Sequence, residues 1–328
     1  MDNKQLSILT LLDFSNAFNA VDFELLLAVL QSINVATDVT DWFRSYLFGR
    51  RQSVHINSHS SSYLPLTTGV PQGSVLSPLL FSIFINTIPK ILSSSFHLYA
   101  DDLQVYVTCT AHDIDDAIAR LNQDLLNISN WCKAYGLHVN PAKSQAIIIG
   151  STFQLSKLDC IKLPAILYDN VSLTFCSHVK NLGLLIDSNL SWSVQVAEVS
   201  RKIFATISSF NRLKHLLPVK TKICLAQSLL LPILDYADCS YTDLTEEQLN
   251  KLERLQNVCI KFIFALRKFD HVSEYRNQLK WLTIRHRRNL HILSLLYSIL
   301  YNPYSPNYLK TRFSFLGTNT DCHLDLRS

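Results

Sequence analysis

The segment FHLYADDLQVYV, residues 96–107, places two adjacent carboxylates, Asp101 and Asp102, between two short apolar runs. Short apolar runs on either side of a favoured turn residue predict a β-hairpin with both carboxylates at its tip. A like-charged pair at such a tip is most often a solvated turn. Function therefore requires further groups that the fold brings to the same place.

A third carboxylate, Asp13, lies at the end of the segment KQLSILTLLDF, which predicts a buried strand. If this strand lies beside the hairpin in a sheet, Asp13 approaches Asp101 and Asp102. Three converging carboxylates are costly unless cations neutralise them, and sites made only of carboxylate oxygens suit Mg²⁺ or Mn²⁺. Two such ions, about 3.5 to 4 Å apart, stabilise the attacking and leaving oxygens of in-line phosphoryl transfer. The three aspartates therefore indicate a two-metal site.

The elements predicted in the first half of the chain mix strands and helices. In order, the patterns predict strand, helix, helix, strand, long helix, hairpin, helix and strand, and the fourth element is the alternating segment RQSVHIN. This order predicts an α+β sheet covered by helices on one face. Short strands follow, and residues 192–301 have helical patterns throughout. We therefore expect two domains, 1–186 and 187–328.

Positive charge gathers in the C-terminal part of the chain. Residues 1–150 contain 8 Lys and Arg against 12 Asp and Glu, 151–200 contain 3 against 4, and 201–328 contain 19 against 10. A basic segment indicates a polyanionic partner such as nucleic acid, although solvated helix faces can hold the same excess. The charge pattern alone leaves both interpretations open.

Composition favours an intracellular chain. The longest apolar runs, VLSPLLFSIFI and HILSLLYSILY, have about 11 residues, whereas a membrane span needs about 20, so we expect no membrane segment. The N-terminal segment does not resemble a secretion signal. The eight cysteines occur without C-x-x-C pairs, as buried thiols in a reducing compartment do. We therefore expect a nuclear or cytoplasmic protein that is not secreted.

Four longer motifs resemble those of reverse transcriptases, in the same order and at similar spacing. They are LLDFSNAFNAVD at 11–22, GVPQGSVLSPLLFSIFIN at 69–86, LYADDLQVY at 98–106 and GLHVNPAKSQAIII at 136–149. The segment VKNLGLLIDSNLSW and the helical region after it resemble the non-LTR retrotransposons, in particular the jockey-like elements of animals. The resemblance implies an RNA-directed DNA polymerase, with 1–186 as the palm and 187–328 as the helical thumb and C-terminal region.

The resemblance also implies roles for the residues that match the motifs. Asp13 and Asp101 would ligate two Mg²⁺ ions, for which Mn²⁺ could substitute. The Phe14 carbonyl would be an additional ligand, and Asp102 a weaker one. Lys143 would protonate the leaving pyrophosphate as a general acid. The implied partners are an RNA template, a DNA primer and deoxynucleoside triphosphates.

Three further residues match motif positions near the incoming nucleotide. The Phe18 ring would clash with a 2′-hydroxyl and so favour deoxynucleotides. Gln72 can bond to a sugar or a base, and Gly73 lets the backbone approach closely. Each also has a structural interpretation, as core packing for Phe18 and as a plain turn for the Pro-Gln-Gly segment.

The sequence also departs from the family pattern. Such elements usually have Lys at the position of Asn16 and Asp at the position of Asn19. Only twelve residues precede Asp13, whereas the family places its fingers well upstream, and no endonuclease domain is recognisable. We therefore expect an N-terminally truncated chain whose fingers are largely missing. A longer element protein could supply the fingers or the endonuclease.

Two hypotheses follow from these patterns. The first is an active RNA-directed DNA polymerase that adds nucleotides to a primer 3′-hydroxyl. The second is a catalytically defective remnant that retains only nucleic-acid binding.

Overall fold

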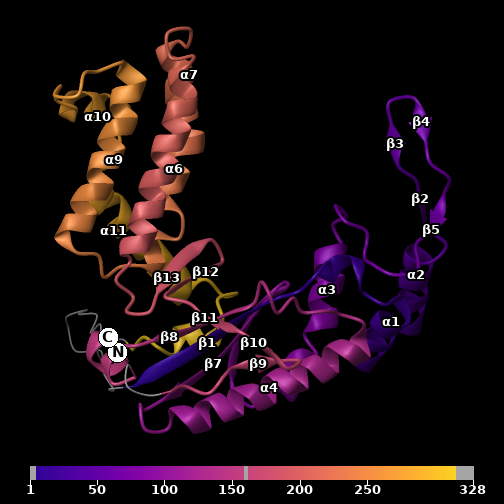
Figure 1. Ribbon diagram of the computed structural model, residues 1–328. Helices are drawn as coiled ribbons and strands as arrows, with labels where there is room; N and C mark the ends of the chain where they lie inside the picture. The colour runs from indigo at the N-terminus through magenta and orange to yellow at the C-terminus, as the bar shows by residue number, and fades with distance from the viewer. Residues whose placement is uncertain (1–4, 159–161, 315–328) are drawn as a thin grey trace. The chain divides into compact units, whose positions relative to one another are not determined.

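The computed structural model describes residues 5–158 and 162–314 (Figure 1). The chain divides into two compact units, Met1–Leu190 and Ser191–Ser328. The first unit combines a sheet with helices, and the described part of the second is helical. The α+β class predicted from the sequence is therefore confirmed.

A five-stranded sheet with the order β11-β8-β1-β7-β6 forms the centre of the first unit. Its strands are β1 (Leu6–Asp13), β6 (Ser95–Tyr99), β7 (Asp102–Cys109), β8 (Gln145–Ile149) and β11 (Thr174–Phe175). β1 is antiparallel to β7 and β8, and β11 is parallel to β8. β6 and β7 form the predicted hairpin, which lies beside the strand that ends at Asp13.

Helices pack against one face of this sheet, and the long helix α4 runs along it (Figure 1). The Asp22 side chain caps α1 by accepting a hydrogen bond of 2.9 Å from Leu25 N–H, and Gly136 ends α4 with a φ of 72°. Six apolar positions that recur at helical spacing along α4 are buried: Ile114, Ile118, Leu121, Leu125, Ile128 and Trp131. The helices of this unit are α1 (Phe23–Ser32), α2 (Thr37–Leu47), α3 (Ser77–Ile85), α4 (Ile114–Tyr135), α5 (Thr152–Ser156) and the short 3₁₀ turns η1 (Ala17–Asn19) and η2 (Ile88–Ile91).

The side chains of β1 alternate between two environments. Ile8 and Leu12 belong to the core shared with the helices. Leu9 belongs to a smaller cluster that includes Val179 from a two-stranded ribbon. Because alternate residues of a strand share a face, Asp13 lies with Leu9 on the face away from the helices.

The strand predicted at RQSVHIN is not part of the sheet. Residues 51–65 form a projecting ribbon whose short strands are exposed (Figure 1). The segment alternates as a strand does, but it pairs only with the chain that returns beside it and covers no core. The short strands of the unit are β2 (Arg51–Gln52), β3 (His55–Ile56), β4 (His59–Ser60), β5 (Leu64–Pro65), β9 (Leu167–Tyr168), β10 (Val171–Ser172), β12 (His178–Asn181) and β13 (Leu184–Asp187).

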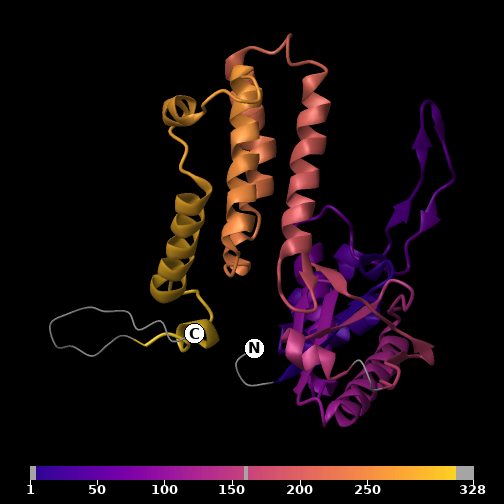
Figure 2. The same cartoon turned by 60° about the vertical axis from the view of Figure 1, so that its left-hand side comes forward.

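The second unit consists of helices around a core of its own. α9 begins with a capping box, in which the side chains of Thr245 and Gln248 each bond to the other residue's backbone N–H. Figure 2 shows the long helices α6 and α9 side by side. The helices are α6 (Ser193–Asn211), α7 (Val219–Leu225), the π-helical turn η3 (Ala226–Leu230), α8 (Leu231–Asp235), the 3₁₀ turn η4 (Asp238–Ser240), α9 (Glu246–Phe264), α10 (Ser273–Leu279), α11 (Ile284–Tyr301) and α12 (Asn307–Lys310).

Within the described residues, one helical stretch, Val219–Ser240, is long and apolar enough to cross a membrane by length and composition alone. Counting uninterrupted apolar runs did not single it out, because lysines and other polar residues interrupt it. The stretch contributes Leu230, Leu231 and Leu234 to the core of the second unit. A buried core helix of a soluble protein passes the same test, so the stretch is weak evidence for a membrane segment.

Candidate active site

The sheet brings the three predicted aspartates to one edge. Asp13 is the last residue of β1 and lies directly opposite Asp102, the first residue of β7. Asp101 occupies the two-residue turn before Asp102, where Ala100 has a φ of 51°. A two-residue turn between paired strands leaves no room for the carboxylates to separate along the chain. Pairs of residues that face each other across strands point to the same side, so Asp13 and Asp102 share the face away from the helices.

Like charges crowd this edge of the sheet. Partial burial, then the neighbouring Asp101 and Asp13 carboxylates, raise the pKa of Asp102. Among the described residues, the oxygens of Asp13, Asp101 and Asp102 do not all lie within 4.8 Å of one another. An all-oxygen donor set of high negative charge suits hard divalent cations.

Phe14 and Lys143 adjoin the aspartates. Phe14 is buried and forms an isolated β-bridge with Val139. Lys143 Nζ lies 3.9 Å from Asp13 Oδ2, and its side chain is 70% exposed. An exposed ammonium at this distance can move toward a bound anion without breaking a buried pair.

The loop that contains Lys143 is attached to the end of β1 by the backbone. Asn140 N–H donates to the Asp13 carbonyl at 2.7 Å, and Asp13 N–H donates to Ser144 Oγ at 3.2 Å. Ser144 Oγ in turn donates to the Asn140 carbonyl at 2.9 Å. Lys143 is therefore placed beside Asp13 by the backbone of its own loop, and sequence reasoning had no signal for the part that Ser144 plays.

Phe18 lies in η1, the 3₁₀ turn that follows β1. Its ring stacks on Phe81 of α3, with ring centroids 4.3 Å apart and an interplanar angle of 25°. The Phe18 carbonyl also accepts a hydrogen bond of 2.9 Å from Val70 N–H. The ring is thus half-buried against the core, and this contact holds it in one orientation.

Gln72 and Gly73 lie in the loop that precedes α3, which bonds to the loop after β1. Gln72 Nε2 donates to Asn19 Oδ1 at 3.0 Å. Gly73 has a φ of 84°, and nothing lies within 4 Å of the position that a Cβ would take. Gly69 has a φ of 90°, and a Cβ there would lie 2.8 Å from the Asn19 carbonyl oxygen. Asn19, which the sequence marked only as a departure, is therefore a contact between the two loops.

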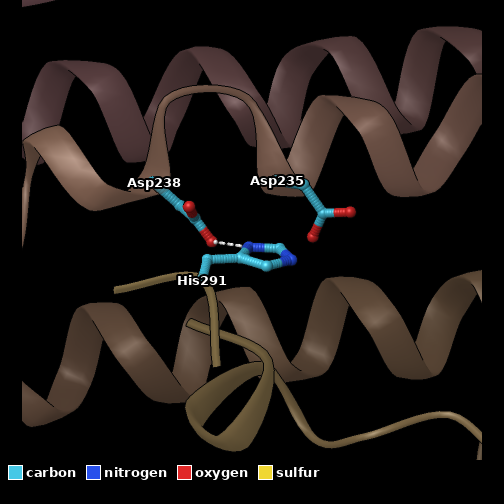
Figure 3. Close-up of side chains that lie close together, drawn as sticks. All are labelled: Asp235, Asp238 and His291. Atoms are coloured by element: carbon cyan, nitrogen blue, oxygen red, sulfur yellow. Dashed lines mark hydrogen bonds and ion pairs between the residues drawn. The ribbon is translucent and has the colours of Figure 1, made fainter. Parts of the chain in front are cut away.

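A second cluster of ligand-type side chains, Asp235, Asp238 and His291, lies in the helical unit (Figure 3). His291 Nδ1 lies 2.8 Å from Asp238 Oδ2, and the ring reaches between the two carboxylates. Arg287 donates two hydrogen bonds of 2.5 Å to the two oxygens of Asp235, and these bonds raise the Arg287 pKa.

This cluster is an ion-pair network between α8, η4 and α11. The second guanidinium, Arg288, is 5% exposed and donates to the carbonyls of Asp238 and Tyr241. Because Arg287 already neutralises Asp235, a cation would have to displace it. Sequence reasoning missed the network because its members lie far apart in the chain and match no ligand motif.

The comparisons with known proteins bear on the first unit most directly. Residues 1–186 match the family model described as reverse transcriptase (RNA-dependent DNA polymerase). The match covers more than half of the chain, and it includes all three aspartates, Lys143 and the loops with Phe18 and Gln72. The chain therefore belongs to the reverse transcriptase family.

Two curated relatives come from non-LTR elements of flies. The chain is 26% identical over 275 residues to a probable RNA-directed DNA polymerase from transposon BS of Drosophila melanogaster, covering 80% of this chain and 29% of the relative. It is 26% identical over 270 residues to the RNA-directed DNA polymerase from mobile element jockey of Drosophila funebris, covering 78% of this chain and 28% of the relative. The resemblance to jockey-like elements is confirmed, and the chain spans less than a third of these relatives.

Among solved structures, the chain is similar to telomerase from Candida tropicalis in complex with a fragment of telomeric RNA. The sequence identity is 12%, the TM-score is 0.41, and the match covers 94% of this chain and 49% of that one.

Proposed function

We propose that this chain is the palm and thumb of an RNA-directed DNA polymerase, which extends a DNA primer on an RNA template by attack of the primer 3′-hydroxyl on a deoxynucleoside triphosphate. The observation that supports the proposal is the crowding of Asp13, Asp101 and Asp102 at one sheet edge, where partial burial and then the neighbouring carboxylates raise the pKa of Asp102. Like charges that face each other across paired strands destabilise the fold unless bound cations neutralise them.

Two Mg²⁺ ions, or Mn²⁺ in their place, fit this donor set. When bound, they would stabilise the attacking and leaving oxygens of the transfer. Asp13 and Asp101 would hold both ions, the Phe14 carbonyl would add an oxygen, and Asp102 would be a weaker ligand. Lys143, 3.9 Å from Asp13, would donate a proton to the departing pyrophosphate.

The loops beside the aspartates would bind the incoming nucleotide. The Phe18 ring, held by Phe81, would exclude a 2′-hydroxyl. Gln72 and Gly73 would contact the nucleotide or the template, and the open space around Gly73 allows a strand to approach.

In this proposal residues 1–186 are the palm and 187–328 the thumb and C-terminal region. Fingers and endonuclease segments would be supplied by a longer element protein, in the nucleus or the cytoplasm.

The test is primer extension by the purified chain on an RNA template with an annealed DNA primer, in Mg²⁺ and then in Mn²⁺. Asp101→Asn should abolish extension, because it removes a ligand shared by both ions. Asp243→Asn, which removes an exposed loop carboxylate in the helical unit, is the matched control and should extend as the wild type does. Extension at the wild-type level in Asp101→Asn would rule the assignment out.

The second candidate is a catalytically defective remnant that binds nucleic acid. The excess of 19 Lys and Arg over 10 Asp and Glu in residues 201–328 favours it. It predicts no extension by a folded wild-type chain, together with binding that weakens steeply with salt as counterions are released. An affinity that does not change with salt would contradict it.

A further inference from the structure

Two sets of cations in the helical unit differ in their partners. The first set has acidic partners within the unit: Arg201 and Lys202 share Glu198, and Arg276 pairs with Glu253, Arg285 with Glu246, and Arg287 with Asp235. Arg288 is buried against backbone carbonyls. The arginine-rich start of α11 therefore has little charge left for a partner.

The second set is exposed and lies on two loops and on the first turn of α7, which follows one of them. Within the part of the chain that the structure describes, none of its members has a carboxylate oxygen within 4.0 Å. The set, called the distal basic set below, consists of Arg212, Lys214, Lys220, Arg267 and Lys268.

The two loops leave the same end of the helical unit (Figures 1 and 2). Residues 212–218 follow the C-terminal end of α6, and residues 265–272 follow the C-terminal end of α9. Those helix ends are in contact, because the rings of Phe210 and Phe262 have centroids 5.6 Å apart. The distal basic set therefore lies on one region of the unit.

Acidic residues are scarce around this end. The sequence has no Asp or Glu from Val199 to Leu234. Asp270 is the one acid in residues 265–272, and its carboxylate accepts a hydrogen bond of 2.7 Å from Arg267 N–H within the turn. The field of the region is therefore positive at the loop surface.

An aromatic ring completes the region. Phe269 is 87% exposed, and Lys268 Nζ lies 5.5 Å from its ring centroid. An exposed ring among cations that lack a carboxylate partner offers a surface on which a base can stack, beside groups that can bind phosphates. Proteins that bind single-stranded nucleic acid combine these two features.

We propose that the distal basic set and Phe269 bind a single strand of RNA or DNA, with the cations on its phosphates and Phe269 stacked on a base. The choice of nucleic acid over an anionic lipid surface rests on the proposed function, in which the chain works on an unpaired template. The surface itself is independent of the aspartates, so binding there does not require catalysis.

The experiment measures binding of the full chain to a labelled, unstructured RNA oligonucleotide by fluorescence anisotropy over a range of salt concentrations. In the triple variant Arg212→Gln, Lys214→Gln, Lys220→Gln, the slope of log affinity against log salt should fall by about 0.7 for each lost phosphate contact, or about two in all. The matched control, Lys251→Gln, Arg254→Gln, Arg312→Gln, removes the same charge from exposed positions elsewhere and should keep the wild-type slope. Equal slopes for the two triple variants would overturn the proposal.

Phe269→Ala tests the stacking contact. It should weaken binding of the single strand about tenfold and leave binding of a duplex of the same sequence unchanged. Unchanged affinity of Phe269→Ala for the single strand would overturn the proposal. So would binding to phosphatidylserine vesicles that is stronger than binding to RNA and that the triple variant also loses. Asp101→Asn separates the two proposals, because it should bind RNA as the wild type does even where extension is lost.

Discussion

Asp13 and Asp102 face each other directly across the β1–β7 strand pair, at the edge where β7 leaves its hairpin turn. Cross-strand neighbours of like charge destabilise a sheet, and partial burial, followed by the nearby Asp101 and Asp13 carboxylates, raises the pKa of Asp102. This local repulsion is what bound cations would relieve in the proposed function.

The first prediction concerns the pH dependence of stability. The folded-state pKa of Asp102 is raised above the ordinary value of 3.8. The folded chain therefore holds this proton more tightly than the unfolded chain, and ionisation of Asp102 lowers stability as pH rises above about 3.8. Asp102→Asn should be more stable than the wild type at neutral pH, by about 0.5 kcal/mol after solvent screening.

Chemical denaturation at a series of pH values, without divalent cations, measures this difference. The advantage of Asp102→Asn should vanish below the ordinary pKa, where the residue is protonated in both states. Asp243→Asn is the control and should show no such trend. A constant difference at all pH values would contradict the role of charge.

The second prediction concerns divalent cations. If Mg²⁺ binds the folded sheet edge and not the unfolded chain, as the proposed function requires, it should stabilise the folded chain by about 1.4 kcal/mol at a concentration of ten times its Kd. Asp13→Asn should lose the shift in melting temperature, and Asp243→Asn should keep it. An equal shift in melting temperature for Asp13→Asn and Asp243→Asn would show that the cation binds at a site other than the Asp13 edge of the sheet.

The third prediction compares two glycines of the loop before α3. Gly69→Ala should destabilise the chain by about 2 kcal/mol or more, because its Cβ meets the Asn19 backbone in addition to the strain of a positive φ. Gly73→Ala should lose only about 1 kcal/mol, since its φ is also positive but its surroundings are open. Equal unfolding free energies for the two variants would show that the contact with Asn19 does not hold the loop.

The fourth prediction concerns the choice of sugar. Phe18→Ala should lower the preference for deoxynucleotides about tenfold or more in primer extension, because the ring that would meet a 2′-hydroxyl is gone. Phe18→Tyr keeps the ring and should keep the preference. The loss of stacking on Phe81 should also destabilise Phe18→Ala by about 2 kcal/mol, so the ratio of incorporation rates is the decisive readout.

The fifth prediction concerns the network in the helical unit. Arg287→Met should destabilise the chain by about 2 kcal/mol, since it leaves the half-buried Asp235 carboxylate beside Asp238 without its partner. The same change should create affinity for Zn²⁺, because Asp235, Asp238 and His291 then lie together without the Arg287 charge. Arg285→Met, which breaks an exposed pair with Glu246, is the control and should do neither. Zn²⁺ binding that is equally strong in the wild type would show that Arg287 does not block the site.

Much of the first unit could be predicted from the sequence, because its signals are local. The apolar spacing of α4 and the hairpin around Asp101 both follow from side chains near one another in the chain. The segment RQSVHIN shows the limit of such reasoning. Its alternation of apolar and polar residues correctly indicates a strand. The alternation does not show whether the strand joins the central sheet or pairs only with the segment that follows it in the chain.

The site was predictable only as a set of residues. The motifs named Asp13, Asp102 and Lys143, but their meeting depends on the pairing of β1 with β7 and on the bonds from Asn140 and Ser144 to the end of β1. These contacts join residues about ninety to one hundred and thirty positions apart, and a sequence does not state which of many such pairings is made.

By itself the sequence determined the α+β class, the helical second half, the residues of the polymerase motifs and an excess of positive charge after residue 200. Only the tertiary structure decided that Asp13 and Asp102 are neighbours, and that the cations near α11 are neutralised while those on residues 212–220 and 265–272 are not. The physical reason is that periodicity and composition act between near neighbours, whereas repulsion and ion pairing depend on distances in space that only the folded chain sets.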